Sequence, residues 1–120
     1  MRQLPLLLPA LLLALPPAAA QGPMACALNN TYQNLSVRLH LQAANGQDIA
    51  PATWQSFLPM MEVCAPLQGA AAVRYEVTMS SVVPGAVPFI LCAVTVNQPS
   101  GRARMMVTGG QGAALQCSIQ

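Results

Sequence analysis

One stretch of this chain has a helix-like apolar pattern, and the fold prediction depends on it: residues 48–67, DIAPATWQSFLPMMEVCAPL. Its apolar side chains recur at the i, i+3, i+4 and i+7 spacing of one helix face. Pro51 suits the first helical position, where its missing N–H costs nothing. Pro59 should kink the helix, and Pro66 should end it. The sequence therefore predicts one helix over residues 48–67, whose apolar face carries Trp54, Phe57, Leu58, Met61 and Ala65.

The rest of the chain has the patterns of strands and turns. Apolar and polar residues alternate in residues 35–42 and 73–80, as expected of half-buried strands. Residues 89–96, FILCAVTV, are apolar on both faces, which is typical of a central strand. Further strands are expected at residues 102–108 and 115–119. Short connections favour an antiparallel meander. We therefore expect an α+β fold, in which one helix packs on an antiparallel sheet of about five strands, in the order strand, helix, four strands.

The first twenty residues have the composition of a secretory signal peptide. Arg2 precedes an apolar run, LPLLLPALLLAL, and three alanines supply the small residues that a signal peptidase requires. The run is too short and too rich in proline to span a membrane. A lipid anchor on Cys26 is the alternative, but Pro23 and Met24 are poor residues before such a site. We expect residues 1–20 to be removed on export. Residues 21–120 would then form a single small secreted or periplasmic domain, with no transmembrane segment after cleavage.

Four cysteines remain in the exported part: Cys26, Cys64, Cys92 and Cys117. An even number in a small exported domain indicates disulfides, and no CxxC pair suggests a zinc or redox motif. Three connectivities exist. In a single meander Cys92 and Cys117 would lie two strands apart, at about 9–10 Å, which is beyond the reach of a disulfide. We therefore expect the pairs Cys64–Cys92 and Cys26–Cys117.

The few ionisable residues exclude several classes of function. The exported part carries four arginines, no lysine and three carboxylates, which is not the dense basic face of a nucleic-acid binder. The one histidine, His40, has no recognisable nucleophile, metal triad or phosphate-binding loop beside it, so neither an enzyme nor a cofactor is expected. A Cu(I) site is the alternative that the methionines raise, although methionine more often fills gaps in a core. The methionines concerned are Met24, Met60, Met61, Met79, Met105 and Met106.

Residues 25–34, ACALNNTYQN, have the composition of a polar loop. They contain the glycosylation sequon Asn29-Asn30-Thr31, and a second one, Asn34-Leu35-Ser36, follows. Sequons are short, and we interpret both as chance matches.

Two turns rich in proline and glycine, residues 82–86 and residues 97–101, are candidate binding surfaces, because rigid loops lose little entropy on binding. Plain turn chemistry is the alternative. The segment Ser81 to Gly85 resembles the inhibitory loop Gln-x-Val-x-Gly of the cystatins, without the glutamine, and the expected order of elements is similar to the cystatin fold. Gly22 would stand for the N-terminal glycine of that family. The resemblance implies inhibition of cysteine proteases. The candidate partner-binding residues are Val82, Val83, Pro84, Gly85 and Pro99.

These observations together predict a small exported binding module that acts on another protein. A peptidase or hydrolase inhibitor, working through its loop tips, is the preferred form. The alternative is a structural or assembly component of the cell envelope. Such a component would pair through an exposed sheet edge, for which the poorly charged last strands are suited.

Overall fold

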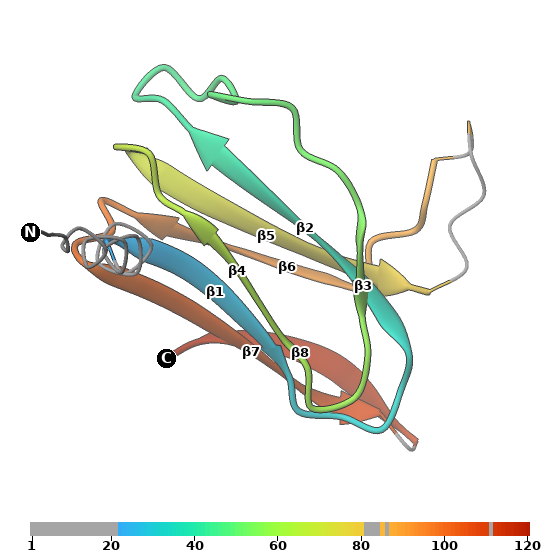
Figure 1. Cartoon of the computed structure of the whole chain (residues 1–120). Coiled ribbons are helices and arrows are strands. Elements are labelled where there is room, and N and C mark those ends of the chain that lie inside the picture. Colours follow the sequence, from blue (N-terminus) through green and yellow to red (C-terminus); the bar gives the residue numbers. More distant parts are fainter. Residues whose placement is uncertain (1–21, 81–84, 86, 111) are drawn as a thin grey trace, which may run out of the picture.

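The computed structural model describes residues 22–80, 85, 87–110 and 112–120. Within these residues the chain forms two four-stranded sheets that pack face to face (Figure 1). No helix forms in this part of the chain, so the expected helix and the α+β fold are wrong. The strands are β1 (Met24–Asn29), β2 (Leu35–Gln42), β3 (Gln55–Phe57), β4 (Glu62–Pro66), β5 (Ala72–Met79), β6 (Cys92–Asn97), β7 (Arg102–Gly110) and β8 (Ala113–Ile119).

Successive segments of the chain alternate between the two sheets. Sheet A has the strand order β4-β1-β7-β8, and sheet B has the order β3-β2-β5-β6. Every pair in sheet B is antiparallel, whereas β1 pairs antiparallel with β4 and parallel with β7. The chain crosses from one sheet to the other after β1, β3, β4 and β6. The single-sheet meander is therefore wrong, although most neighbours are antiparallel as expected.

The stretch predicted as a helix is divided between the two sheets. It forms β3, a tight turn and β4, and Pro59 lies in the turn. A turn tolerates the fixed φ and the missing N–H of proline, whereas a helix interior loses a hydrogen bond there. Phe57 is fully buried, Trp54 is half-buried, and Leu58 and Met61 are exposed. The helical spacing thus grouped the core residue Phe57 with the half-buried Trp54 and with exposed residues, and these side chains share no buried face.

The core lies between the sheets and comes from strict alternation along the strands. In β2 and β5 every second side chain points inward, and Val37, Tyr75 and Val77 are fully buried. These two strands confirm the alternation predicted for residues 35–42 and 73–80. Sheet A contributes smaller or more flexible side chains to the same core, namely Ala25, Ala27, Ala103, Met105 and Val107.

Two other expectations about strands are wrong. The apolar run at residues 89–96 gives β6, which lies at the edge of sheet B with half-buried side chains, and not at its centre. The supposed polar loop at residues 25–34 begins with β1, which lies inside sheet A between β4 and β7. Its inward residues are Ala25 and Ala27, which are too small to give a clear apolar alternation in the sequence.

The disulfides are Cys26–Cys64 and Cys92–Cys117, so the expected pairing is wrong. The first joins β1 to its neighbour β4, where the two Cα atoms are 4.0 Å apart. The second joins β6 of sheet B to β8 of sheet A, with its Cα atoms 5.8 Å apart. Cys92 and Cys117 would lie too far apart in a single sheet, but their strands belong to different sheets and face each other across the sandwich. Both disulfides indicate an oxidising compartment.

The expected signal peptide lies outside the described residues, so the division into a leader and one domain stays a prediction. Among the described residues, no helix is long and apolar enough to cross a membrane.

Candidate functional site

Several connections lie at one end of the sandwich, among them the β1–β2 turn, the β3–β4 turn and the start of the β5–β6 connection (Figure 1). The register brings them together. Leu35, the first residue of β2, lies opposite Phe57 at the end of β3 and Met79 at the end of β5. Segments far apart in the sequence therefore form one continuous end surface.

Asn29 holds the first two of these turns in place. Its Nδ2 group donates to the carbonyl oxygens of Phe57, at 2.8 Å, and Gln33, at 2.9 Å. Its Oδ1 atom accepts hydrogen bonds from the backbone N–H and the hydroxyl of Thr31. Because the side chain of Asn29 is fully buried and fully used, its sequon is closed to glycosylation in the folded chain. Asn34, in the second sequon, is exposed.

The backbone of Asn29 continues the same connection. Its N–H donates to the Met61 carbonyl oxygen at 3.0 Å, and its carbonyl oxygen accepts from the Met60 N–H at 2.7 Å. Asn30 in turn donates its N–H to the Val107 carbonyl oxygen on β7. The two turns are thus fixed to each other and to sheet A by backbone hydrogen bonds.

This end of the molecule exposes large apolar side chains on its ordered backbone. Tyr32 is 80% exposed at the β1–β2 turn, and Met60 is 62% exposed at the β3–β4 turn. Single exposed apolar residues are ordinary, but a group of them on one surface marks an interaction site. We call this group the apolar end, and it consists of Tyr32, Leu58, Met60, Met61, Met79 and Phe89.

Met60 combines exposure with backbone strain. The Met61 N–H donates to the Leu58 carbonyl oxygen at 3.0 Å, which closes a turn with Pro59 and Met60 at its centre. Met60 has a φ of 63°, the left-handed value that this turn requires at its third position. Glycine or asparagine normally fills such a position, because a longer side chain is strained there. Strained residues tend to lie at functional sites, and this one presents a large apolar side chain to solvent.

The residues chosen from the sequence are not all brought together. Val82, Val83 and Pro84 lie outside the described residues, and Gly85 is exposed on the β5–β6 connection. Pro99 follows β6 at the opposite end of that strand, where Gln98 donates its N–H to the Ala71 carbonyl oxygen. The two turns therefore belong to different ends of sheet B, and their role in binding stays a prediction.

Sequence reasoning missed the apolar end because it assigned Leu58, Met60 and Met61 to a helix. The usable signal was Pro59, which favours the second position of a turn and would have placed the residues around it at a surface. Tyr32 gave no signal of its own in an Asn-rich loop.

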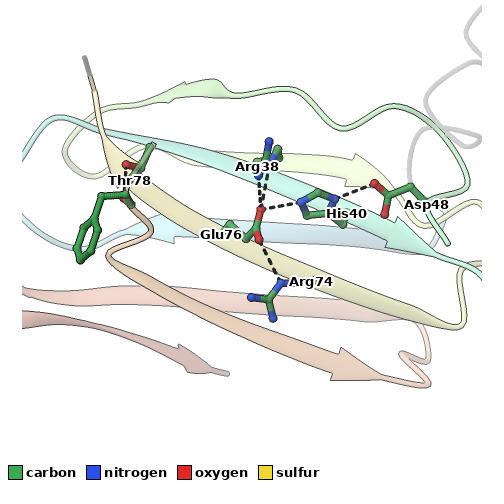
Figure 2. Close-up of polar contacts among 7 residues, drawn as sticks. Arg38, His40, Asp48, Arg74, Glu76 and Thr78 are labelled. Atoms are coloured by element: carbon green, nitrogen blue, oxygen red, sulfur yellow. Dashed lines mark hydrogen bonds and ion pairs between the residues drawn. The ribbon is translucent and has the colours of Figure 1, made fainter. Parts of the chain in front are cut away.

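A second cluster, of charged residues, lies on the outer face of sheet B (Figure 2). Glu76 is at its centre and is only 9% exposed. Its Oε1 atom accepts hydrogen bonds from Arg38 at 2.8 and 2.9 Å and faces the His40 Nε2 atom at 2.7 Å. Its Oε2 atom accepts from Arg74 at 3.2 Å, and the other ring nitrogen of His40 lies 2.9 Å from Asp48. Every carboxylate oxygen of Glu76 is therefore paired.

This environment changes the pKa of Glu76 in a definite direction. Burial acts to raise the pKa, but the hydrogen bonds from His40, Arg38 and Arg74 outweigh it, so the pKa is lowered. Trp54 covers Arg38, whose guanidinium carbon lies 4.3 Å from the centre of the indole ring. The cluster explains the half-buried position of Trp54 outside the core.

The geometry does not support a metal site at His40, at the group Cys26, Glu62 and Cys64, or at the methionines. Both ring nitrogens of His40 already lie within hydrogen-bond distance of carboxylates, Glu76 at 2.7 Å and Asp48 at 2.9 Å, so neither is open to a substrate or an ion in this arrangement. Cys26, Glu62 and Cys64 lie close together, but the two sulfur atoms are bonded to each other, so no thiolate is present to bind an ion. Met105 is fully buried on sheet A, whereas Met60 is exposed in a turn, so these two do not share a site.

The described surface also contains a hollow of about 560 Å³ beside the Cys26–Cys64 disulfide, lined by Pro23, Met24, Gly101 and Arg102 among others. It lies where β1 and β7 begin, at the far end of sheet A from the Asn29 turn. Arg102 there also approaches Glu62, with an N–O distance of 3.6 Å.

Comparison with known proteins returned no relative: no family model, no curated protein and no solved structure matches this chain.

Proposed function

We propose that this chain is an exported, disulfide-containing binding module, secreted or periplasmic, that contacts another protein through the apolar end. The carrying observation is Met60, which is 62% exposed at a φ of 63° in a turn held by backbone hydrogen bonds. A residue with a strained backbone lowers the stability of the free protein. Contact with an apolar surface of a partner gives such a residue a function.

The arrangement suits recognition without large rearrangement. Asn29 fixes the β1–β2 and β3–β4 turns before any partner arrives, so little conformational entropy remains to be lost on binding. Methionine and tyrosine are also enriched at protein interfaces. The members of the apolar end are all large apolar side chains, so the partner surface that contacts them is proposed to be apolar.

Peptidase or hydrolase inhibition is the narrower form of this proposal. It no longer rests on a likeness to cystatins, because that likeness required a helix that the described chain lacks. It now rests on the turns alone, and a panel of purified peptidases would separate inhibition from simple binding.

The proposal is tested by affinity capture from the extracellular fraction of the source organism, followed by calorimetry with the purified partner. Met60→Asp and Tyr32→Asp place a charge in the contact and should each weaken binding by at least about tenfold, or 1.4 kcal/mol. Ile49→Asp is the matched control, because Ile49 is 41% exposed but lies beside the far end of β2. Equal binding by all three variants would show that the apolar end is not the contact surface.

A further inference from the structure

Strand β8 forms one edge of sheet A and lacks the usual protection of an edge. It pairs with β7 on one side, and no described strand pairs with its other side. Residues 113–120, AALQCSIQ, contain neither a charged residue nor a proline. Natural edge strands commonly carry such residues or a bulge, which prevents pairing with other chains. The register shift of this hairpin lies at Thr108–Gly110, which leaves the C-terminal part of β8 regular.

The register identifies the backbone groups that remain free. Gln120 donates its N–H to the Arg104 carbonyl oxygen at 2.8 Å. Hydrogen bonding alternates along an antiparallel strand, so Gln116 and Ser118 also direct their backbone groups toward β7. Leu115, Cys117 and Ile119 therefore direct their N–H and C=O groups away from the sheet.

The side chains of this segment are symmetric in character about Cys117. The order Leu-Gln-Cys-Ser-Ile reads apolar, polar, cysteine, polar, apolar in both directions. In an antiparallel pair of two copies centred on Cys117, Leu115 lies opposite Ile119 and Gln116 opposite Ser118. Each free N–H then meets a free C=O, and no like charges are opposed.

Ile119 is the residue that gains most from this pairing. It lies opposite Met105, which is fully buried, so its side chain points to the core side of sheet A. It is nevertheless 50% exposed, because no described strand covers this margin of the sandwich. Leu115 of a second copy would cover it.

We propose that β8 is a self-association edge, through which two copies of this chain pair antiparallel over residues 115–119 into one continuous sheet. The symmetry of the segment selects a second copy as the occupant. The pairing is isologous, so it closes as a dimer and does not extend into a filament. The Cys92–Cys117 disulfide fixes the centre of the edge to β6 and keeps it in place for pairing. This edge contains none of the residues of the apolar end. It provides a specific contact surface for the alternative function, that of a structural or assembly component of the cell envelope.

The test combines sedimentation equilibrium with amide hydrogen exchange on the disulfide-bonded exported protein. We expect a reversible dimer. The amides of Leu115, Cys117 and Ile119 should become protected as the concentration rises, whereas those of Gln116 and Ser118 should be protected at every concentration. Ile119→Lys places a charge against the apolar Leu115 of the second copy and should weaken the dimer at least about tenfold. Ile49→Lys is the matched control, because it adds the same charge at a similarly exposed isoleucine away from β8, and it should leave the dimer unchanged.

Three results would overturn the proposal. One is a monomer at all concentrations up to about 1 mM. Another is a dimer that Ile119→Lys and Ile49→Lys affect equally, or whose formation leaves the three amides unprotected. The third is open-ended polymerisation, which an isologous edge does not produce.

Discussion

The Nε2 atom of His40 lies 2.7 Å from the Oε1 atom of Glu76, across the pair formed by β2 and β5. Its other ring nitrogen lies 2.9 Å from Asp48, on the β2–β3 connection. His40 thereby fastens a loop to the outer face of sheet B, and the pair anchors the charged cluster.

Glu76→Gln should destabilise the fold by about 2–3 kcal/mol, because three cationic or donor groups then lose their anionic partner in a largely buried position. Glu62→Gln is the matched control. Glu62 pairs with Arg104 at 3.3 Å, but its side chain is 35% exposed, so its loss should cost less than about 1 kcal/mol. Urea unfolding at neutral pH measures both. Equal losses of unfolding free energy in the two variants would show that the Glu76 cluster stabilises the fold no more than an exposed ion pair does.

The same carboxylate predicts an acid dependence. The pKa of Glu76 is lowered in the folded chain, since its hydrogen bonds outweigh the effect of burial. The folded chain therefore favours the ionised form of this carboxylate more strongly than the unfolded chain does. The resulting stability is present above the ordinary glutamate pKa and is lost as the pH falls through the lowered value. Unfolding free energies measured from about pH 6 to about pH 3 should fall less steeply for Glu76→Gln than for the unchanged chain. Parallel slopes would contradict the assignment.

Tyr75 is the largest fully buried side chain. Its hydroxyl lies near the Cys26 backbone but forms no hydrogen bond of good geometry in the described part of the chain. Tyr75→Phe should leave the free energy of unfolding unchanged or raise it by up to about 1 kcal/mol, because an unpaired buried hydroxyl is removed. Burial also raises the pKa of Tyr75 to about 12, so stability should fall as the pH rises above 10, where the unfolded chain loses the phenolic proton. The variant should lack this part of the alkaline loss. A clear destabilisation at neutral pH would mean that the hydroxyl is satisfied.

The strands that were predictable share one property, a long alternation of large apolar and polar residues. β2 and β5 have it, and their inward residues Val37 and Val77 are in the core as expected. β1 was missed because its inward residues are alanines, and residues 48–67 were assigned wrongly because Trp54 and Leu58 happen to follow helical spacing. Both errors depend on tertiary structure. Ala25 of sheet A and Phe57 of sheet B are buried only because the two sheets pack against each other, and the local sequence pattern does not show this packing.

The disulfides and the candidate site failed for a related reason. The distance between Cys92 and Cys117 depends on whether their strands share a sheet, and no periodicity in the sequence decides that. The apolar end likewise exists only because the register places Leu35 beside Phe57 and Met79. Hydrophobicity at Met60 indicated burial, whereas Pro59 indicated a turn, and the turn determined the outcome.

The strain at Met60 makes a prediction that separates function from stability. Met60→Gly relieves the strain of the left-handed backbone, so it should raise the free energy of unfolding by about 0.5–1 kcal/mol. Glycine also makes the unfolded chain more flexible, which keeps the gain below the full cost of the strain. Met60→Ala removes the same side chain but keeps a Cβ, and it should give no such gain. Both substitutions should weaken capture of the partner, because both remove the side chain proposed to contact it.

Thermal unfolding and calorimetry on the two variants give four results, and each has a defined reading. A stabilised Gly variant with impaired binding means that the free protein maintains a strained residue for the sake of its partner. A destabilised Gly variant would show that the Met60 side chain stabilises the folded chain, and the argument from strain would fail. Unchanged binding by both variants would remove Met60 from the contact surface. Impaired binding by Gly alone would attribute the effect to turn flexibility, because the alanine variant lacks the same side chain and keeps the same backbone.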